Sequence, residues 1–449
     1  MMRKYLLSLF LLALWANAFA QFTVSPDKHY ILKDGKPFFW MGDTAWELFH
    51  RLTREDADFY LKHRSEQGFT VIQAVALAEF NGLDKPNAYG DIPLINNDPA
   101  TPNENYFKHV DYIIDKAASY NLTVALLPTW GDKINKSSWG VGPEIFNVKN
   151  AAIYAEWLAK RYKNRKNIIW ILGGDRNPRD EKDIAIWRAM GLAIKKATDN
   201  KALITYHCQP NEQGSAQWFR NESWFDFNMF QNGHCRDNDN YRKVFDAYNA
   251  QPLKPVIDGE PLYEDHPICF NVTDLGTSSA YDVRHYAYTD LFSGAFGHTY
   301  GCHDVWQMYS PKNEPVNGPH VFWQKALDLP GAKQMQFVRR LIESHPMLDR
   351  IPDQSIIVEN DLPPMSRIQA TRGKDYAFIY SSEGKPFTVI MGKISGDKVK
   401  ATWFDPRSGK TTPAGEADNH GSKKYTPPSS GYGNDWVLVI DDSSKEYSL

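Results

Sequence analysis

Short apolar runs alternate with longer amphipathic stretches over most of this 449-residue chain. The alternation begins near Phe38 and is typical of βα units around a parallel sheet. Eight runs have the length and apolar character of buried strands. They are Phe38–Gly42, Thr70–Leu77, Thr123–Pro128, Ile168–Gly173, Leu203–His207, Phe225–Phe230, Pro255–Gly259 and Gly297–Tyr300. Eight such strands with helices between them predict an α/β fold, the (β/α)8 TIM barrel.

The stretches between these runs carry apolar residues at helical spacing. Thr53 precedes the first stretch and is a suitable N-cap, because its hydroxyl can accept a hydrogen bond from the first turn. The predicted helices are Arg54–Gln67, Tyr106–Ser119, Ala151–Lys163, Glu181–Thr198, Asp282–Phe292 and Gln334–Ser344.

The pattern changes near Arg350, where strand-like runs separated by Gly, Pro and Ser turns replace the βα alternation. These runs are Ile356–Val358, Tyr376–Tyr380, Phe387–Met391, Ala401–Phe404 and Trp436–Ile440. They predict a small antiparallel β-sandwich over residues 351–449, after a barrel over residues 21–350. We expect the sandwich to cover an apolar flank of the barrel rather than to bind a ligand.

The first 20 residues have the three parts of a signal peptide. Arg3 and Lys4 form the basic start, Tyr5–Trp15 is the apolar run, and Ala18–Ala20 is the small-x-small cleavage site. The apolar run is too short to span a bilayer, and Gln21 is not the cysteine that a bacterial lipoprotein needs at this position. We expect a secreted or periplasmic protein without a membrane anchor.

Charge and composition narrow the class of partner. The net charge of −3 is spread along the chain, so the sequence lacks the basic patch of a nucleic-acid-binding protein. Aromatic residues make up 14% of the chain, which suits either stacking on sugar rings or a large core. We expect a carbohydrate substrate and a monomeric protein. Four cysteines, Cys208, Cys235, Cys269 and Cys302, allow one or two disulfides.

Two carboxylates stand directly after predicted strands: Asp175 after the fourth and Glu260 after the seventh. These strands lie opposite each other in such a barrel, and side chains at their C-terminal ends point into the catalytic cup. A retaining glycosidase needs two carboxyl groups about 5–5.5 Å apart, one as nucleophile and one as acid/base. The alternative for each is a solvated loop acid or a helix cap. Asp258, still within its strand, is expected to face the barrel interior as a hydrogen-bonded strut.

Polar and aromatic residues follow the other strands, as expected for a pocket that hydrogen-bonds hydroxyl groups and stacks on sugar rings. Alternative roles are a helix cap for Asp43, core packing for Trp46 and Trp130, and a loop anchor for Tyr263, which could otherwise orient Glu260. The predicted substrate-binding residues are Asp43, Trp46, Gln73, Trp130, Asn177, His207, Gln231, Tyr263 and Tyr300, with Asn232, His298 and Trp306 also close to strand ends.

Two alternative functions stay open. His207, His234, His298 and His303 lie near strand ends, as in metal-dependent barrel hydrolases, but HxH, HExxH and CxxC spacings are absent. We therefore expect no metal and no other cofactor. The second alternative is a catalytically inactive barrel that binds polysaccharide.

Four motifs together resemble glycoside hydrolase family 140, the apiosidase-like bacterial enzymes: Phe38–Trp46, Gly68–Gln73, Trp170–Asn177 and Ile257–Pro261. The resemblance spans the whole barrel. The tail motif Trp403–Gly409 is similar to the C-terminal module of these proteins, which is named for collagen binding without implying collagen as a ligand.

The resemblance implies the catalytic roles, which spacing alone leaves open. It makes Asp175 the acid/base and Glu260 the nucleophile, and it implies release of apiose from side chains of the pectin rhamnogalacturonan II. One departure concerns Asp175. The wider group of retaining barrel glycosidases presents Asn-Glu after the fourth strand, whereas this chain has the shorter acid in Gly174-Asp175.

Overall fold

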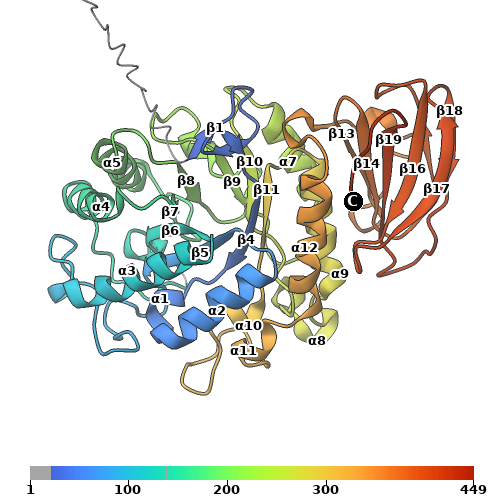
Figure 1. Ribbon diagram of the computed structural model, residues 1–449. Helices are drawn as coiled ribbons and strands as arrows, with labels where there is room; N and C mark the ends of the chain where they lie inside the picture. Colours follow the sequence, from blue (N-terminus) through green and yellow to red (C-terminus); the bar gives the residue numbers. More distant parts are fainter. Residues whose placement is uncertain (1–21, 138) are drawn as a thin grey trace, which may run out of the picture.

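The computed structural model describes residues 22–137 and 139–449, and it contains an eight-stranded parallel barrel followed by an antiparallel domain (Figure 1). The predicted signal peptide lies outside the described residues. The strand order β8-β7-β6-β5-β4-β11-β10-β9 follows the chain around the barrel, which confirms the predicted fold class. The strands are β4 (Trp40–Thr44), β5 (Val71–Leu77), β6 (Thr123–Thr129), β7 (Ile168–Gly173), β8 (Ile204–His207), β9 (Asn228–Gln231), β10 (Val256–Glu260) and β11 (Gly297–Tyr300).

Strands β8 and β9 close the barrel. The N–H of Asp226 donates to the carbonyl of Ile204 at 2.9 Å, and the Thr205 hydroxyl donates to the carbonyl of Phe227 at 2.6 Å. Strand β9 begins later than predicted, because Phe225 donates its N–H to Glu222 in a turn (3.1 Å).

Helices cover the outside of the barrel, and several of them, including α2, α3, α4 and α5, begin at a residue whose side chain caps the first turn. Thr53 accepts the N–H of Asp56 at 3.1 Å, as predicted. Within the described ranges, none of the helices has the length and hydrophobicity needed to cross a membrane. The helices are α1 (Leu48–Arg51), α2 (Arg54–Glu66), α3 (Glu104–Ser119), α4 (Val148–Tyr162), α5 (Glu181–Ala197), α6 (Ala216–Phe219), α7 (Asn240–Asn249), α8 (Val272–Leu275), α9 (Ala280–Phe292), α10 (His303–Trp306), α11 (Trp323–Ala326) and α12 (Pro330–Glu343).

An ion pair between Asp43 on β4 and Arg64 on α2 lies inside the fold. The two side chains are fully buried, 2.7 Å apart, and the hydroxyl of Tyr60 also donates to Asp43 at 2.5 Å. Asp43 therefore holds a helix against the barrel. It neither caps a helix nor contacts the cavity described below.

Replacement of Arg64 by methionine is expected to lower the free energy of unfolding by about 3–5 kcal/mol, because it leaves the Asp43 carboxylate buried without its counter-charge. Lys62→Met on the same helix is the matched control. Lys62 pairs with Glu66 at 3.9 Å, and both side chains are more than 60% exposed, so its loss should cost under about 0.5 kcal/mol. Denaturant unfolding followed by circular dichroism measures both, and equal stabilities of the two variants would contradict the prediction.

The C-terminal domain has a six-stranded antiparallel sheet in the order β12-β13-β14-β19-β16-β17, faced by the two-stranded sheet β15-β18. The predicted strand Ile356–Val358 is wrong: residues 354–356 form a 3-10 turn, in which the Asp353 side chain accepts the N–H of Ser355 at 3.1 Å. The strands are β12 (Ile351–Pro352), β13 (Ile368–Arg372), β14 (Tyr376–Ser381), β15 (Phe387–Ile390), β16 (Lys398–Phe404), β17 (Thr411–Asp418), β18 (Ser422–Tyr425) and β19 (Trp436–Asp442), while a separate small sheet near the N-terminus contains β1 (Phe22–Val24), β2 (Ile31–Lys33) and β3 (Lys36–Pro37).

Strand β14, inside the six-stranded sheet, is buried on both faces. Alternate residues of β14 point to opposite sides: Phe378 and Tyr380 join the barrel core, while Ile379 joins the core between the two sheets. Helices α9 and α12 lie between the barrel and this domain (Figure 1). Tyr288 of α9 stacks on Tyr380 at 4.9 Å. The domain therefore covers an apolar flank of the barrel.

Candidate active site

A cavity of about 530 Å³ lies at the C-terminal ends of the barrel strands and contains both predicted catalytic acids. Its wall is rich in aromatic side chains. A larger cavity of about 740 Å³, bordered by residues 85–88 and 310–314, contains neither acid. The residues that line the cavity of about 530 Å³ are Trp46, Glu79, Phe80, Trp130, Trp139, Asp175, Pro210, Gln231, Gly233, His234, Glu260, Tyr263, His266, Phe270, Trp306, Val316 and Asn317.

Asp175 is presented by a turn with three consecutive positive φ angles: 85° at Gly173, 110° at Gly174 and 51° at Asp175. A side chain at Gly173 would clash with the carbonyl of His207, and one at Gly174 would come within 3.0 Å of the Trp130 backbone. The two glycines therefore let the chain leave β7 in a conformation that other residues rarely adopt.

Two neighbours hold the carboxyl group of Asp175. The indole N–H of Trp139 donates to its Oδ2 at 3.0 Å, and the guanidinium of Arg176 lies 3.5 Å from the same oxygen. Arg176 also lies over the Trp139 ring, 4.8 Å from its centroid. Burial and the nearby charge of Glu260 nevertheless raise the pKa of Asp175 to about 6, against the opposing effects of His207 and Arg176. A carboxyl group in this state is suited to donate a proton near neutral pH.

Glu260 follows an irregularity in β10. Asp258 pairs with Phe230 and Glu260 with Gln231, so Gly259 is the extra residue of a β-bulge. Gln73 of β5 donates from Nε2 to the carbonyl of Gly259 at 2.8 Å. Gln73 is fully buried and is not among the residues that line the cavity, so it supports the backbone below Glu260.

Asp258 lies inside the barrel as predicted. Its two carboxyl oxygens accept hydrogen bonds from the Asn232 side chain at 2.7 Å and from the N–H of Glu260 at 3.2 Å. Burial, which outweighs these hydrogen bonds, raises the pKa of Asp258 to about 7. Asp258 and Asn232 thus fix the backbone that carries Glu260.

Two histidines contact the Glu260 carboxylate. Nε2 of His207 lies 2.9 Å from Oε2, and Nε2 of His234 lies 3.3 Å from Oε1. His207 accepts the backbone N–H of Asp175 on Nδ1 at 3.0 Å, so in its neutral form its proton is on Nε2, the nitrogen that lies next to Glu260. Burial alone would raise the pKa of Glu260, but the hydrogen bonds and charge of the two histidines lower it well below its usual value. Glu260 is therefore ionised.

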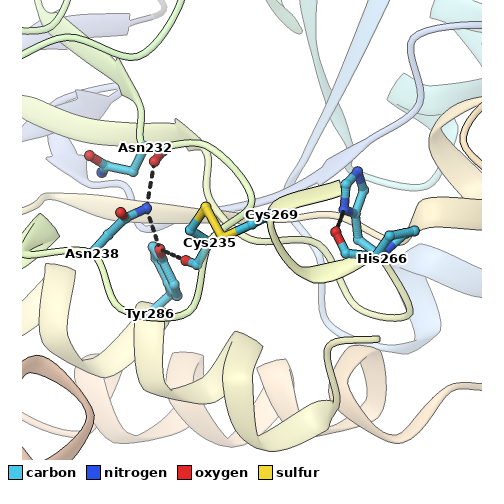
Figure 2. Close-up of a disulfide and its surroundings, with 7 residues drawn as sticks. Asn232, Cys235, Asn238, His266, Cys269 and Tyr286 are labelled. Carbon is cyan, nitrogen blue, oxygen red and sulfur yellow. Dashed lines mark hydrogen bonds between the residues drawn. A yellow bond between two sulfur atoms is a disulfide. The ribbon is translucent and has the colours of Figure 1, made fainter. Parts of the chain in front are cut away.

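A disulfide holds the loop that carries His234 (Figure 2). Cys235, after β9, is bonded to Cys269, after β10, and the N–H of Cys269 donates to the carbonyl of His234 at 2.7 Å. Tyr286 donates its hydroxyl to the carbonyl of Cys235 at 2.6 Å. His266 stacks on His234 with 4.0 Å between ring centroids. The other two cysteines, Cys208 and Cys302, are buried and unpaired.

Aromatic and polar residues predicted to bind substrate form part of the cavity wall: Trp46, Trp130, Gln231 and Tyr263. Trp46 and Trp130 are 5.2 Å apart and pack on His207, so they contribute to the core and to the wall at once. Burial and the charge of Glu260 raise the pKa of Tyr263 far above its usual value, so its hydroxyl stays neutral and can donate.

The other predicted residues that lie outside the cavity are Asn177, His207, Asn232, His298 and Tyr300. Tyr300 is fully buried and donates its hydroxyl to Glu264 at 2.6 Å. Asn177 accepts the N–H of Gln209 at 3.0 Å and joins the loops after β7 and β8. His298 is buried inside the barrel. Like Gln73 and Asp43, these residues shape the barrel rather than border the space for a ligand.

The histidines predicted for a metal-dependent alternative do not form a metal-binding group. His207 and His234 contact Glu260, whereas His303 makes a hydrogen bond with the carbonyl of Asn317 at 3.1 Å. Within residues 22–137 and 139–449, one group of three ligand-type side chains lies close enough to hold a cation: Asp265, Asp304 and His320. None of the four predicted histidines belongs to it.

The sequence prediction missed several residues of the cavity, including Glu79, Trp139, His266 and Phe270. Trp139 lies in the long loop after β6. The aromatic residues of that loop were the sequence signal by which it could have been predicted. Glu79 follows β5 by two residues and offered the same signal as Asp175 and Glu260: a carboxylate just after a strand.

A parallel barrel with two carboxyl groups in an aromatic cavity defines a class, the barrel glycoside hydrolases. Solved structures agree. A glycoside hydrolase is 36% identical, with a TM-score of 0.88, and the alignment covers 96% of this chain and 98% of that one. A family 5 glycoside hydrolase from Bacteroides vulgatus is 34% identical, with a TM-score of 0.88 and coverage of 96% and 95%. A family 5 mannosidase from Rhizomucor miehei, 14% identical with a TM-score of 0.50 and coverage of 72% and 98%, shares the fold alone.

Within this class, the chain belongs to the apiosidase-like family: residues 25–349 match the model "Apiosidase-like, catalytic domain". Residues 351–441 match the model "Putative collagen-binding domain of a collagenase". No curated protein matches the chain. The protein is therefore a glycoside hydrolase-like enzyme of the apiosidase-like family.

Proposed function

We propose that this protein is a retaining glycosidase in which Glu260 is the nucleophile and Asp175 the acid/base. The observation that carries the proposal is the opposite shift of two pKa values in one cavity. Burial and Glu260 raise the pKa of Asp175 to about 6, whereas two histidines lower that of Glu260. Groups whose environments push their pKa values apart are suited to the roles of acid and nucleophile.

The steps follow from these protonation states. Asp175 donates its proton to the glycosidic oxygen as that bond breaks, while ionised Glu260 attacks the anomeric carbon and forms a glycosyl ester. Ionised Asp175 then takes a proton from a water molecule, which attacks the anomeric carbon and releases Glu260. The contact with Trp139 at 3.0 Å stabilises the ionised form of Asp175 between these two steps.

We further propose, from the family, that the substrate is an apiosyl linkage in the side chains of rhamnogalacturonan II and that the enzyme belongs to glycoside hydrolase family 140. The wall of Trp46, Trp130 and Tyr263 supports a small sugar as ligand, because ring faces and a hydroxyl donor converge on it. We propose that the protein is secreted or periplasmic, since pectin is an extracellular polymer. Digestion of rhamnogalacturonan II by the chain from Gln21 tests the substrate: release of apiose supports it, and intact side chains contradict it.

The value of kcat/KM is expected to fall tenfold per pH unit above about pH 6, because Asp175 must be protonated to act as an acid. The raised pKa means that activity is fully present below this value and is lost as the pH rises through it. The acidic limb of the profile lies at a much lower pH, because the lowered pKa of Glu260 keeps this carboxylate ionised in mildly acidic solution. Initial rates from pH 3 to 9 measure the profile. A rate that is constant between pH 6 and 9 would contradict the assignment of Asp175.

A further inference from the structure

Glu79 is a third carboxyl group in the catalytic cavity, and the proposed mechanism does not use it. It follows β5 by two residues and lines the same cavity as Asp175 and Glu260. Its side chain is 9% exposed, so it is nearly withdrawn from solvent but borders the space for a ligand.

The backbone of Glu79 is held in place from the neighbouring loop. Nζ of Lys133 donates to the carbonyl of Ala78 at 2.6 Å and approaches that of Glu79 at 3.4 Å. Lys133 is fully buried and is itself paired with Asp132 at 2.7 Å. The N–H of Asn81 also donates to the Glu79 carbonyl, at 2.8 Å. The hydrogen bonds between Glu79 and other described residues thus use its backbone, and its carboxyl group is left for a ligand.

The charges around Glu79 oppose its ionisation. Burial has the largest effect and raises its pKa well above the usual value, and the neighbouring carboxylates add to this shift, while a guanidinium opposes it. The carboxylates are Asp175, Glu47 and Asp132, and the guanidinium is that of Arg176. An uncharged carboxyl group can donate one hydrogen bond and accept others, which is the capacity needed to bind a sugar hydroxyl.

We infer that Glu79 is a specificity-determining residue that binds a hydroxyl group of an uncharged sugar as a neutral carboxylic acid beside Asp175. The inference rests on the proposed glycosidase function and adds a substrate class at this position. A sugar that carries a carboxylate here would meet ionised Glu260 in the same cavity, so it is disfavoured by like charge. A neutral, hydroxyl-rich sugar meets no such charge.

Binding of methyl apioside and methyl galacturonide to the Glu260→Gln protein, measured by calorimetry, tests the inference without turnover. In that background, Glu79→Ala is expected to weaken methyl apioside binding roughly tenfold, because a buried hydrogen bond to the ligand is lost. Glu79→Gln keeps a donor and an acceptor of the same size and should stay within about threefold. Glu66→Ala, an exposed carboxyl group on α2, is the matched control and should change nothing.

In hydrolysis, Glu79→Ala should raise KM more than it lowers kcat, because Glu79 contacts the substrate without taking part in bond cleavage. The inference is overturned if Glu79→Ala binds methyl apioside as tightly as its parent, or if Glu79→Gln is as weak as Glu79→Ala. Tighter binding of the galacturonide than of the apioside overturns it as well.

Infrared difference spectroscopy separates this inference from the proposed function. The carbonyl band of a protonated carboxyl group is expected at pH 7 in the wild type and should be missing from Glu79→Gln. Identical spectra at this band mean that Glu79 is ionised and overturn the inference, whatever the substrate is. A wild type that carries the band but hydrolyses no glycan contradicts the proposed glycosidase instead.

Discussion

Replacement of Glu260 by glutamine is expected to lower kcat by about 10⁴-fold or more, with little change in the fold. The amide keeps the size of the side chain but cannot form a glycosyl ester, so the first step loses its nucleophile. Rates with an aryl glycoside and with a pectic oligosaccharide measure the effect. Retention of more than about a hundredth of the wild-type kcat would contradict the assignment of the nucleophile.

A smaller side chain provides the control for this result. Glu260→Ala opens space on the face of the sugar that the nucleophile attacks, so added azide is expected to restore turnover and to give a glycosyl azide of inverted configuration. Glu66→Gln, an exposed glutamate on α2, should retain the wild-type rate. An azide product of retained configuration would contradict the assignment, because it would indicate that Glu260 is the acid/base and Asp175 the nucleophile.

Replacement of Asp175 by asparagine is expected to lower kcat/KM by about 10²–10⁴-fold on substrates with a sugar leaving group, which needs a proton to depart. The loss should be much smaller for an aryl glycoside with an acidic phenol, because that leaving group departs without protonation. Hydrolysis of the two substrates by the same variant measures the difference. Equal losses on both would contradict the role of Asp175 as the acid.

The pH profile of this variant gives a second criterion. Asp175→Asn removes the group whose pKa is raised to about 6, so the residual kcat/KM for the substrate with a sugar leaving group should have no alkaline limb. A variant that keeps this limb would assign the ionisation to another group, and Glu79 in the same cavity is a candidate.

Local signals in the sequence were sufficient for the barrel and for the positions of Asp175 and Glu260. Strand-length apolar runs and helical spacing identify the βα units, and a carboxylate that directly follows a strand must lie near the mouth of a parallel barrel. The same reasoning failed where a residue has a partner that is distant in sequence. Asp43 also follows the first apolar run, but Arg64, which is 21 residues away, keeps it buried.

The C-terminal domain shows the same limit for secondary structure. Ile356–Val358 has an apolar composition typical of a strand, yet the Asp353 side chain begins a 3-10 turn there, and only Ile357 forms a bridge, with Val389. Strands with mostly exposed polar residues, such as β17, lacked the alternation on which the sequence prediction depended.

The sequence by itself determined the fold class and the two strand ends that present Asp175 and Glu260, because periodicity and turn chemistry act over a few residues. The tertiary structure alone decided how those acids are tuned. His207, His234 and Trp139 reach the two carboxyl groups from separate loops. Such contacts depend on how distant segments close around one cavity, and the local pattern of residues does not encode that closure.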